Sequence, residues 1–166
     1  MNHTRRVLGF DTFTGFPSVT PLDGSTAVTQ AGAYSVTDAY EEHLAEVLAV
    51  KSRLGSYAHL ERFEPLKGDA PEQLTQYLKK HSETMVSLAY FDLDLYEPTR
   101  ACAEMLVPYF ASGAVIAFDE FIHPVFPGET VAARQVFGNG ARFRRVPMVG
   151  AGHSSYLIFD GPSDGR

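Results

Sequence analysis

The sequence has almost no cysteine and no long apolar run. Its one cysteine, Cys102, lies on the apolar face of a predicted helix, which excludes a disulfide framework and a thiolate metal site. We expect Cys102 to be a small buried core residue. The longest apolar runs fall far short of the roughly 20 residues that a membrane helix needs, so the sequence predicts no membrane partner.

The sequence also lacks a secretory signal and an excess of basic residues. Two arginines near the start are followed by only a short strand-like run before Asp11, which is not the pattern of a signal peptide. We therefore expect a cytoplasmic protein. The formal net charge is −6, whereas a surface that binds nucleic acid would be basic, so no nucleic acid partner is expected.

The length and composition predict one globular domain over residues 1–166. With 166 residues, 45% of them hydrophobic and 20% charged, the chain can bury a core of its own. We find no internal repeat and no run of like charge. Residues 12–35, rich in Pro, Gly, Ser and Thr, predict a long loop that we interpret as a lid. Residues 161–166 predict a frayed tail.

Residues 86–120 contain the pattern around which the rest of the chain is organised. Two unbroken apolar runs, at 86–91 and 113–118, are typical of strands buried on both faces of a parallel sheet. Between them, Pro98 suits the first turn of a helix, and helical spacing of apolar residues continues until Gly113 ends it. The segment therefore predicts a β-α-β unit with parallel strands.

Acidic residues follow both predicted strands of this unit. Asp92 and Asp94 come after the first strand, and Asp119 and Glu120 come after the second. Ligands of open parallel sheets bind beyond the carboxyl ends of the strands, where these side chains would converge. Because gathered carboxylates repel one another, the pattern predicts a centre for Mg²⁺ or a similar hard cation. The alternative is that these acids merely cap the helices that follow.

The remaining segments alternate between strand and helix patterns. Further strands are predicted at 6–10, 60–66, 142–147 and 154–159. Further helices are predicted at 40–54, with Asp38 as the cap, from Pro71 onward, and at 129–137. The alternation predicts an α/β fold with a mostly parallel sheet and a C-terminal antiparallel strand pair.

Five motifs are spread along most of the chain. They are Gly-Phe-Asp-Thr-Phe-Thr-Gly-Phe-Pro at 9–17, Lys-Gly-Asp-Ala at 67–70, Tyr-Phe-Asp-Leu-Asp-Leu-Tyr-Glu-Pro-Thr at 90–99, Ala-Phe-Asp-Glu at 117–120 and Pro-Gly-Glu-Thr at 127–130. Together they resemble the macrocin O-methyltransferase family. The resemblance implies a Rossmann-like class I methyltransferase sheet, S-adenosylmethionine (SAM) and a divalent metal such as Mg²⁺ as cofactors. It also implies a small-molecule acceptor, a sugar or polyhydroxylated natural product, methylated on a hydroxyl.

The resemblance assigns metal-binding and catalytic roles. Asp92, Asp119 and Glu120 match the family's metal ligands, although the family more often has Asp or Asn where Glu120 stands. Asp94 matches the acid proposed as general base, and His123 would lie on the acceptor side, unless it is an ordinary exposed loop histidine. This set suits the chemistry, because a sugar hydroxyl is a poor nucleophile until a metal stabilises the alkoxide and a carboxylate takes the proton.

The resemblance also assigns the cofactor residues. Asp11 matches the acid that hydrogen-bonds the SAM ribose, and Gly68, Asp69 and Ala70 match the segment that lines its adenine. A carboxylate that accepts both ribose hydroxyls is also the device of dinucleotide folds. The alternatives are that Asp11 caps its own loop and that Asp69 caps the helix opened by Pro71, a role that is compatible with cofactor binding.

One element of the family is missing from the sequence. Class I methyltransferases hold SAM on a glycine-rich loop after their first strand, and this chain begins at what resembles the second strand. In the family's strand order 3-2-1-4-5-7-6, the missing strand would separate the 3-2 pair from the 4-5-7-6 group. We therefore expect an N-terminally truncated domain or a variant without SAM binding. It would re-pair its strands or borrow one, for example in a homodimer.

Three other functions stay open from the sequence. Phe-Asp-Leu-Asp at 91–94 resembles the nucleophile strand of haloacid dehalogenase phosphatases, but Leu95-Tyr96 stand where that motif has a threonine. A glycosyltransferase with Asp-x-Asp would leave Asp11 and the Gly-Asp-Ala segment without a role. From another class, the chain could be a catalytically inactive methyltransferase remnant that acts as a binding or dimerisation module.

Overall fold

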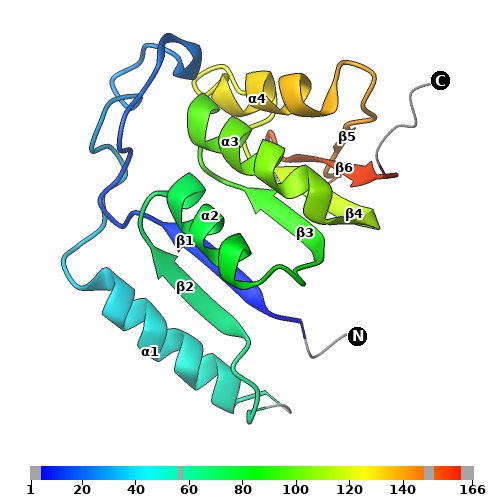
Figure 1. Cartoon of the computed structure of the whole chain (residues 1–166). Coiled ribbons are helices and arrows are strands. Elements are labelled where there is room, and N and C mark those ends of the chain that lie inside the picture. Colours follow the sequence, from blue (N-terminus) through cyan, green and yellow to red (C-terminus); the bar gives the residue numbers. More distant parts are fainter. Residues whose placement is uncertain (1–4, 56–57, 148–151, 162–166) are drawn as a thin grey trace.

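Strands and helices alternate along the chain in a computed structural model that describes residues 5–55, 58–147 and 152–161. The strands form two sheets (Figure 1). The first consists of β1 (Val7–Asp11) and β2 (Phe63–Lys67), which pair in parallel. The second contains, in spatial order, β3 (Val86–Phe91), β4 (Phe110–Phe118), β6 (Ser155–Phe159) and β5 (Arg144–Arg145). The predicted α/β class is confirmed.

The directions of the strands also agree with the sequence pattern. β3 and β4 are parallel neighbours, with Phe91 opposite Phe118, so the β-α-β prediction is confirmed. β6 is antiparallel to both β4 and β5, which confirms the predicted C-terminal pair, although β5 has two residues where six were expected. Part of the connection between β5 and β6, and the predicted tail after Gly161, lie outside the described residues.

The break between the two sheets lies where the sequence predicted the missing strand. The orders β1-β2 and β3-β4-β6-β5 correspond to the 3-2 and 4-5-7-6 groups, and no strand among the described residues pairs with both β1 and β3. The two strands nevertheless lie near each other in Figure 1, and Arg5 donates a hydrogen bond to Ser87 across the gap. Among the residues that the structure describes, therefore, the edges of β1 and β3 do not re-pair.

The hydrophobic core lies under three helices that cover one side of the sheets. These are α2 (Ala70–Lys80), α3 (Tyr96–Leu106) and α4 (Gly128–Phe137) (Figure 1). Phe91 and Phe118, paired at the carboxyl ends of β3 and β4, stack with ring centroids 5.1 Å apart. Cys102, on α3, is buried in this core, as predicted. The core thus holds β3, β4 and the helix between them as one unit.

The predicted helix at 40–54 forms, but its cap and its burial differ from expectation. α1 (Tyr40–Arg53) begins after Ala39, a left-handed residue without a capping side chain, so the prediction of Asp38 as the cap is wrong. None of the residues of α1 is buried, and Val47 and Val50 are each 47% exposed. The reason is that α1 lies beside the two-stranded sheet, where little chain is present to cover it.

The end of α3 also differs from the prediction. The helix stops at Leu106 and a short 3-10 turn (Val107–Tyr109) follows, because Pro108 has no backbone N–H with which to continue the helical hydrogen bonds, although Val107 before it is still helical (φ −47, ψ −48). β4 has already begun at Phe110. Gly113, predicted to end the helix, lies inside β4 with φ +80, where the pairing with β3 shifts register.

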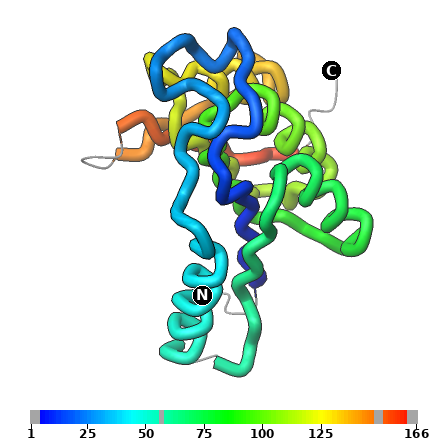
Figure 2. The backbone as a smooth tube through the Cα atoms, turned by 90° about the vertical axis from the view of Figure 1, so that its left-hand side faces the viewer, coloured from blue at the N-terminus to red at the C-terminus, as the bar shows by residue number. Residues whose placement is uncertain are grey.

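The long loop after β1 runs to the end of the molecule where α3 and α4 begin, and then returns to α1 (Figure 2). It contains one 3-10 turn (Pro21–Asp23), whose Asp23 is buried. This segment includes the predicted lid at 12–35. Whether it moves as a lid remains a prediction.

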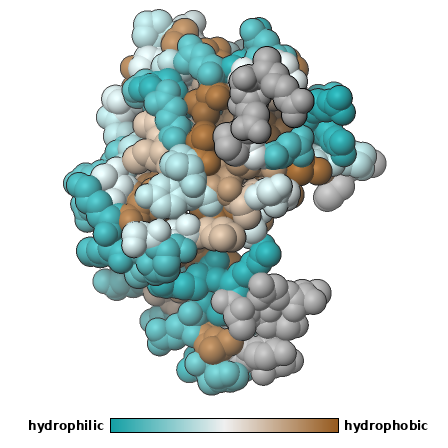
Figure 3. Space-filling view, turned by 45° about the vertical axis from the view of Figure 1, so that its right-hand side comes forward, coloured by the Kyte–Doolittle hydropathy of each residue, from teal (hydrophilic) through white to brown (hydrophobic). Residues whose placement is uncertain are grey.

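Apolar side chains also reach the surface of the sheets. Val7, Leu88 and Tyr90 are more than half exposed. On the face that comes forward in Figure 3, apolar surface lies between hydrophilic regions. None of the helices in the described parts of the chain is long and apolar enough to span a bilayer.

Candidate active site

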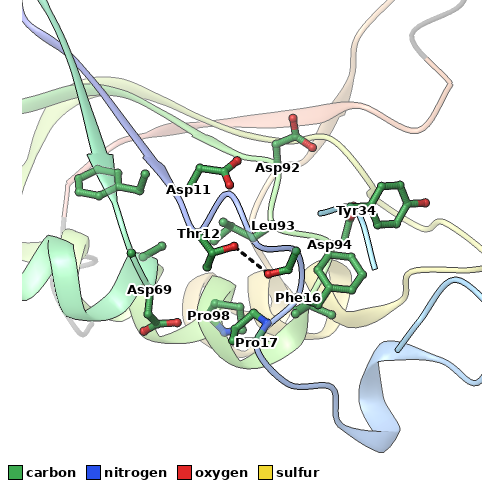
Figure 4. Close-up of a pocket in the computed structure, with 15 residues that line it drawn as sticks. Asp11, Thr12, Phe16, Pro17, Tyr34, Asp69, Asp92, Leu93, Asp94 and Pro98 are labelled. Carbon is green, nitrogen blue, oxygen red and sulfur yellow. Dashed lines mark hydrogen bonds between the residues drawn. The ribbon is translucent and has the colours of Figure 1, made fainter. Parts of the chain in front are cut away.

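A cavity of about 240 Å³ opens beyond the carboxyl ends of β1, β2 and β3. The predicted site residues in its lining are Asp11, Gly68, Asp69, Ala70, Asp92 and Asp94. In Figure 4, Asp11 extends from the end of β1 and Asp92 from the segment after β3, on the same side of the cavity. The structure thus brings the predicted cofactor residues together with the predicted base and one predicted metal ligand.

The cofactor side of the cavity is built from two tight turns. Asp11 Oδ1 accepts the backbone N–H of Phe13 at 2.7 Å, and the Asp11 carbonyl accepts that of Gly68 at 2.9 Å. Gly68 has φ +138, and a Cβ there would lie 2.7 Å from Nε2 of Gln73. Asp69 caps α2 by accepting the N–H of Glu72 at 3.4 Å. Asp11 therefore caps its own loop and Asp69 caps α2, as the structural alternatives proposed. Both residues also line the cavity.

Asp94, the predicted base, also lines the cavity, and its backbone has an unusual conformation. Its φ is +59, in the left-handed region that L-residues rarely adopt. Burial, followed by the charges of Asp92, Glu120 and Asp119, raises the pKa of the Asp94 carboxyl to about 6. A base with a pKa close to neutrality is well matched to accepting a proton at physiological pH.

Asp92 and Asp119 directly follow the neighbouring strands β3 and β4, as predicted. Burial, then the charges of Asp119 and Asp11, raises the pKa of Asp92. Asp119 Oδ1 accepts hydrogen bonds from the Tyr90 hydroxyl and from Ser154 Oγ, the latter at 2.9 Å. Burial and the bond to Asp119 raise the pKa of Tyr90, which keeps its hydroxyl a donor.

Glu120 and His123 lie beyond Asp119, in the loop after β4. Nδ1 of His123 accepts the backbone N–H groups of Val125 and Phe126 at 3.3 and 3.2 Å, and lies 3.4 Å from Oε2 of Glu120. The structure therefore brings His123 to Glu120, whereas Asp94 belongs to the cavity wall.

The predicted ligands fit a divalent cation in their chemistry. Carboxylate oxygens are the ligands that Mg²⁺ prefers. Burial first, and then repulsion from neighbouring carboxylates, raises the pKa of Asp92 and of Asp94, and a bound cation would relieve that repulsion. Among the described residues, however, no three His, Cys, Asp or Glu side chains are gathered as a ready-made metal cage. The donors are present at one edge of the sheet without being closed into a cluster.

The fit to SAM is partial. The turn at Gly68 and the Asp11 carboxylate form one wall of the cavity, where a ribose and an adenine would lie according to the resemblance. The cavity of about 240 Å³ is smaller than the roughly 300 Å³ at which small-molecule pockets usually begin. The described residues therefore provide one part of a cofactor site, consistent with the gap between β1 and β3.

Two buried acids near the site were missed by sequence analysis. Glu129, in the first turn of α4, has no exposed surface and accepts three backbone N–H groups from the loops after β3 and β4. Burial, opposed by these hydrogen bonds, raises the pKa of Glu129 to about 7. Asp23, in the long loop, accepts the N–H of Tyr96. The one signal for Glu129 was its place in the Pro-Gly-Glu-Thr motif, and no motif pointed to Asp23.

Neither a protein-family model nor a curated protein matches the sequence, but solved structures do. The crystal structure of CalS11, a calicheamicin methyltransferase, is 39% identical with a TM-score of 0.87, covering 93% of this chain and 60% of CalS11. The chain has the methyltransferase fold. The apo structure of CalS11, a TDP-rhamnose 3'-O-methyltransferase of calicheamicin biosynthesis, gives 35% identity, a TM-score of 0.75, and coverage of 93% and 58%.

A third structure extends the comparison of the fold. The O-methyltransferase NovP is 18% identical with a TM-score of 0.63, covering 93% of this chain and 60% of NovP. The chain thus spans about 60% of the length of the solved structures it matches. These structures confirm the resemblance to O-methyltransferases that the motifs gave.

Proposed function

We propose that this chain forms the site of an O-methyltransferase that uses SAM and Mg²⁺ and acts on a hydroxyl of a sugar or another small natural product. The observation that carries the proposal is the position of Asp94, the predicted base, in the cavity that the predicted cofactor residues also line. Asp94 lines the same cavity as Asp11 and Gly68, and burial followed by the charges of neighbouring carboxylates raises the pKa of its carboxyl to about 6. A base and a cofactor wall that face the same cavity are what transfer to an acceptor hydroxyl needs.

The acidic residues that follow the strands would bind the metal and accept the proton. Asp92, Asp119 and Glu120 would hold Mg²⁺, which when bound supplies positive charge that makes a hydroxyl more acidic. Asp94 would accept the proton of that hydroxyl if the two lie within about 3 Å, directly or through one water. His123, beside Glu120, would contact the acceptor from the loop after β4.

The cofactor side of the cavity would hold the methyl donor. Asp11, Gly68, Asp69 and Ala70 would bind SAM, which supplies the methyl group. Asp11 has one oxygen, Oδ1, fixed by the Phe13 N–H, which orients the other oxygen for a ribose hydroxyl. Methyl transfer then depends mainly on alignment of the two reactants, and a rigid turn at each wall favours alignment.

The acceptor class can be narrowed by the comparison. CalS11 is described as a TDP-rhamnose 3'-O-methyltransferase, and this chain is 39% identical to CalS11 over 93% of its own length. We extend that substrate class to this chain as a nucleotide-activated sugar. The phosphatase and glycosyltransferase alternatives gain no support from these relatives.

A second candidate function is a binding or dimerisation module without activity. The observation that favours it is the break between the sheets, since no described strand joins β1 to β3. Such a module would retain affinity for the metal at Asp92 and Asp119 without affinity for SAM. In a homodimer, the partner would offer a strand to these edges, and sedimentation would detect the doubled mass.

The test is a calorimetric titration of S-adenosylhomocysteine into the purified chain, with and without Mg²⁺. We expect binding to the native chain and weaker binding to the Asp11→Asn variant, because the ribose loses a charged acceptor. Asp160→Asn is the matched control, since Asp160 is exposed and follows β6 at the opposite end of the β4–β6 pair.

A companion assay separates the two candidate functions. Methyl transfer from SAM to TDP-rhamnose is followed by mass spectrometry. Methyl transfer to TDP-rhamnose would support the proposed O-methyltransferase function. Absence of heat and of transfer, in a chain that circular dichroism shows to be folded, contradicts the enzyme and favours the inactive module.

A further inference from the structure

Glu129 connects the ends of two neighbouring strands. Its Oε1 accepts the backbone N–H groups of Leu93 at 2.9 Å and of Asp94 at 3.1 Å, which follow β3. Its Oε2 accepts the N–H of Glu120 at 3.1 Å, which follows β4. One side chain therefore holds both of the loops that carry the candidate base and metal ligands.

The surroundings of Glu129 make these hydrogen bonds important. Its side chain has no exposed surface, and a buried carboxylate is unfavourable unless its oxygens are hydrogen-bonded. Bonds from N–H to a carboxylate are shorter and stronger than neutral ones. The three N–H groups lie beyond the strand ends, where a buried donor needs an acceptor outside the ladder. The Glu129 carboxylate thus provides the acceptors that the loop N–H groups need, and these N–H groups provide the donors that the buried carboxylate needs.

The helix that carries Glu129 is itself fixed in place. A Cβ at Gly128 would lie 2.5 Å from both the Tyr96 nitrogen and Oδ1 of Asp23, so α4 begins in direct contact with the start of α3. Thr130 Oγ1 accepts the N–H of Ile122 at 2.7 Å. The first turn of α4 is therefore attached on both sides of Glu129, and its carboxylate has little freedom to shift.

The hydrogen bond from the Asp94 N–H to Glu129 holds the candidate base itself. Asp94 has φ +59, a strained conformation for a residue other than glycine, which persists only when its surroundings impose it. The Glu129 oxygen receives the Asp94 N–H in that conformation. This bond sets the direction in which the Asp94 carboxylate leaves the chain.

We infer that Glu129 is a positioning residue for the proposed methyl transfer, and that its carboxylate fixes Asp94 relative to the Asp119–Glu120 pair. The inference rests on the function proposed above. Glu129 is buried beneath the strand ends, so it acts through the loops it holds and does not contact the acceptor.

The test compares Glu129→Gln with the native chain. The amide keeps one acceptor oxygen for Leu93 and Asp94, but its NH₂ group then faces the Glu120 N–H, donor against donor. We expect Mn²⁺ affinity, measured by electron paramagnetic resonance without substrate, to fall about 10- to 100-fold. The kcat should fall in the same range while the acceptor KM stays within about twofold.

Asp23→Asn is the matched control, since Asp23 is also a buried carboxylate that accepts a backbone N–H at the same helix junction. It should lower the melting temperature and leave Mn²⁺ affinity at the native level. If Glu129→Gln does not fold, Glu129→Asp replaces it, which keeps the charge but is one methylene too short to reach both loops. It should show the same loss of affinity and of kcat.

The outcomes separate the two proposals. An active native chain whose Glu129 variants keep native Mn²⁺ affinity and kcat overturns the inference and leaves the proposed function intact. A native chain that neither binds Mn²⁺ nor transfers a methyl group overturns both. Equal losses in the Glu129 and Asp23 variants would show a general structural effect and overturn the positioning role.

Discussion

Asp23 Oδ1 accepts the backbone N–H of Tyr96, the first residue of α3, at 2.5 Å, although the two residues lie far apart in sequence. Its other oxygen accepts the N–H and the hydroxyl of Thr20. The middle of the long loop is thereby attached to the start of a core helix. Opening of the whole segment at 12–35, interpreted from the sequence as a lid, requires this attachment to break.

The first prediction concerns the stability provided by this attachment. Asp23→Ala should lower the free energy of unfolding by about 2 kcal/mol, because a buried N–H loses a charged acceptor. Urea denaturation followed by circular dichroism measures the change. Asp38→Ala, an exposed position in the same connection, should change it by less than about 0.5 kcal/mol. Equal effects of the two substitutions would contradict the prediction.

The second prediction concerns Asp94 as the base. Asp94→Asn should lower kcat for methyl transfer about 100- to 10,000-fold, because the amide cannot accept the proton. The affinity for S-adenosylhomocysteine should stay at the native level, since the wall that would hold it is formed by Asp11 and Gly68. Stopped assays and calorimetry give the two values. A kcat equal to that of Asp160→Asn would rule out Asp94 as the base.

The third prediction concerns pH and the metal-free chain. Because burial raises the pKa of Glu129 from 4.5 to about 7, the folded chain binds this proton more tightly than the unfolded chain does. Stability is therefore greatest below the unfolded value and declines as pH rises from about 4.5 to 7, by roughly 3 kcal/mol for this shift. The raised pKa of Asp94 acts in the same direction.

Urea denaturation in the presence of EDTA, at pH 5 and at pH 7.5, measures this dependence. The native chain should be less stable at the higher pH, and the difference should shrink in Glu129→Gln, which has no carboxyl to titrate. A native chain that gains stability over the same range would contradict the assigned environment of Glu129.

The fourth prediction concerns the single thiol. Burial, then the charge of Asp69, raises the pKa of Cys102 to about 12. At pH 8.5 the folded chain should therefore resist iodoacetamide, because alkylation needs an accessible thiolate. Modification, followed by mass spectrometry, should appear only in urea concentrations that unfold the chain. Rapid alkylation of the folded chain would contradict the burial of α3 against the sheet.

The correct parts of the sequence interpretation are those with a local signal. The acids after β3 and β4 follow their strands directly, so two apolar runs were enough to bring Asp92 and Asp119 to one edge. The turn with Asp69 and Pro71 likewise carries its own capping signal. Whether these residues bind a metal or a cofactor stays a prediction.

The errors have physical causes of two kinds. The helix prediction that extended to Gly113 ignored Pro108, and the cap assigned to Asp38 relied on composition where Ala39 adopts a left-handed conformation instead. Glu129 and Asp23 were missed because their partners are backbone N–H groups distant in sequence. No pattern of side chains records such a bond, and it emerges only when the elements pack.

The break between the two sheets also divides the molecule into parts of unequal resistance to local opening. α1, β1 and β2 contain no buried residue, whereas β4 alone buries Phe110, Ala114, Ile116 and Phe118. Amide hydrogens of β1 and β2 should therefore exchange with deuterium much faster than those of β4. Asp11 belongs to the labile part and Asp94 to the persistent one, so a molecule bound between them would slow exchange in β1 and β2 while that of β4 stays the same.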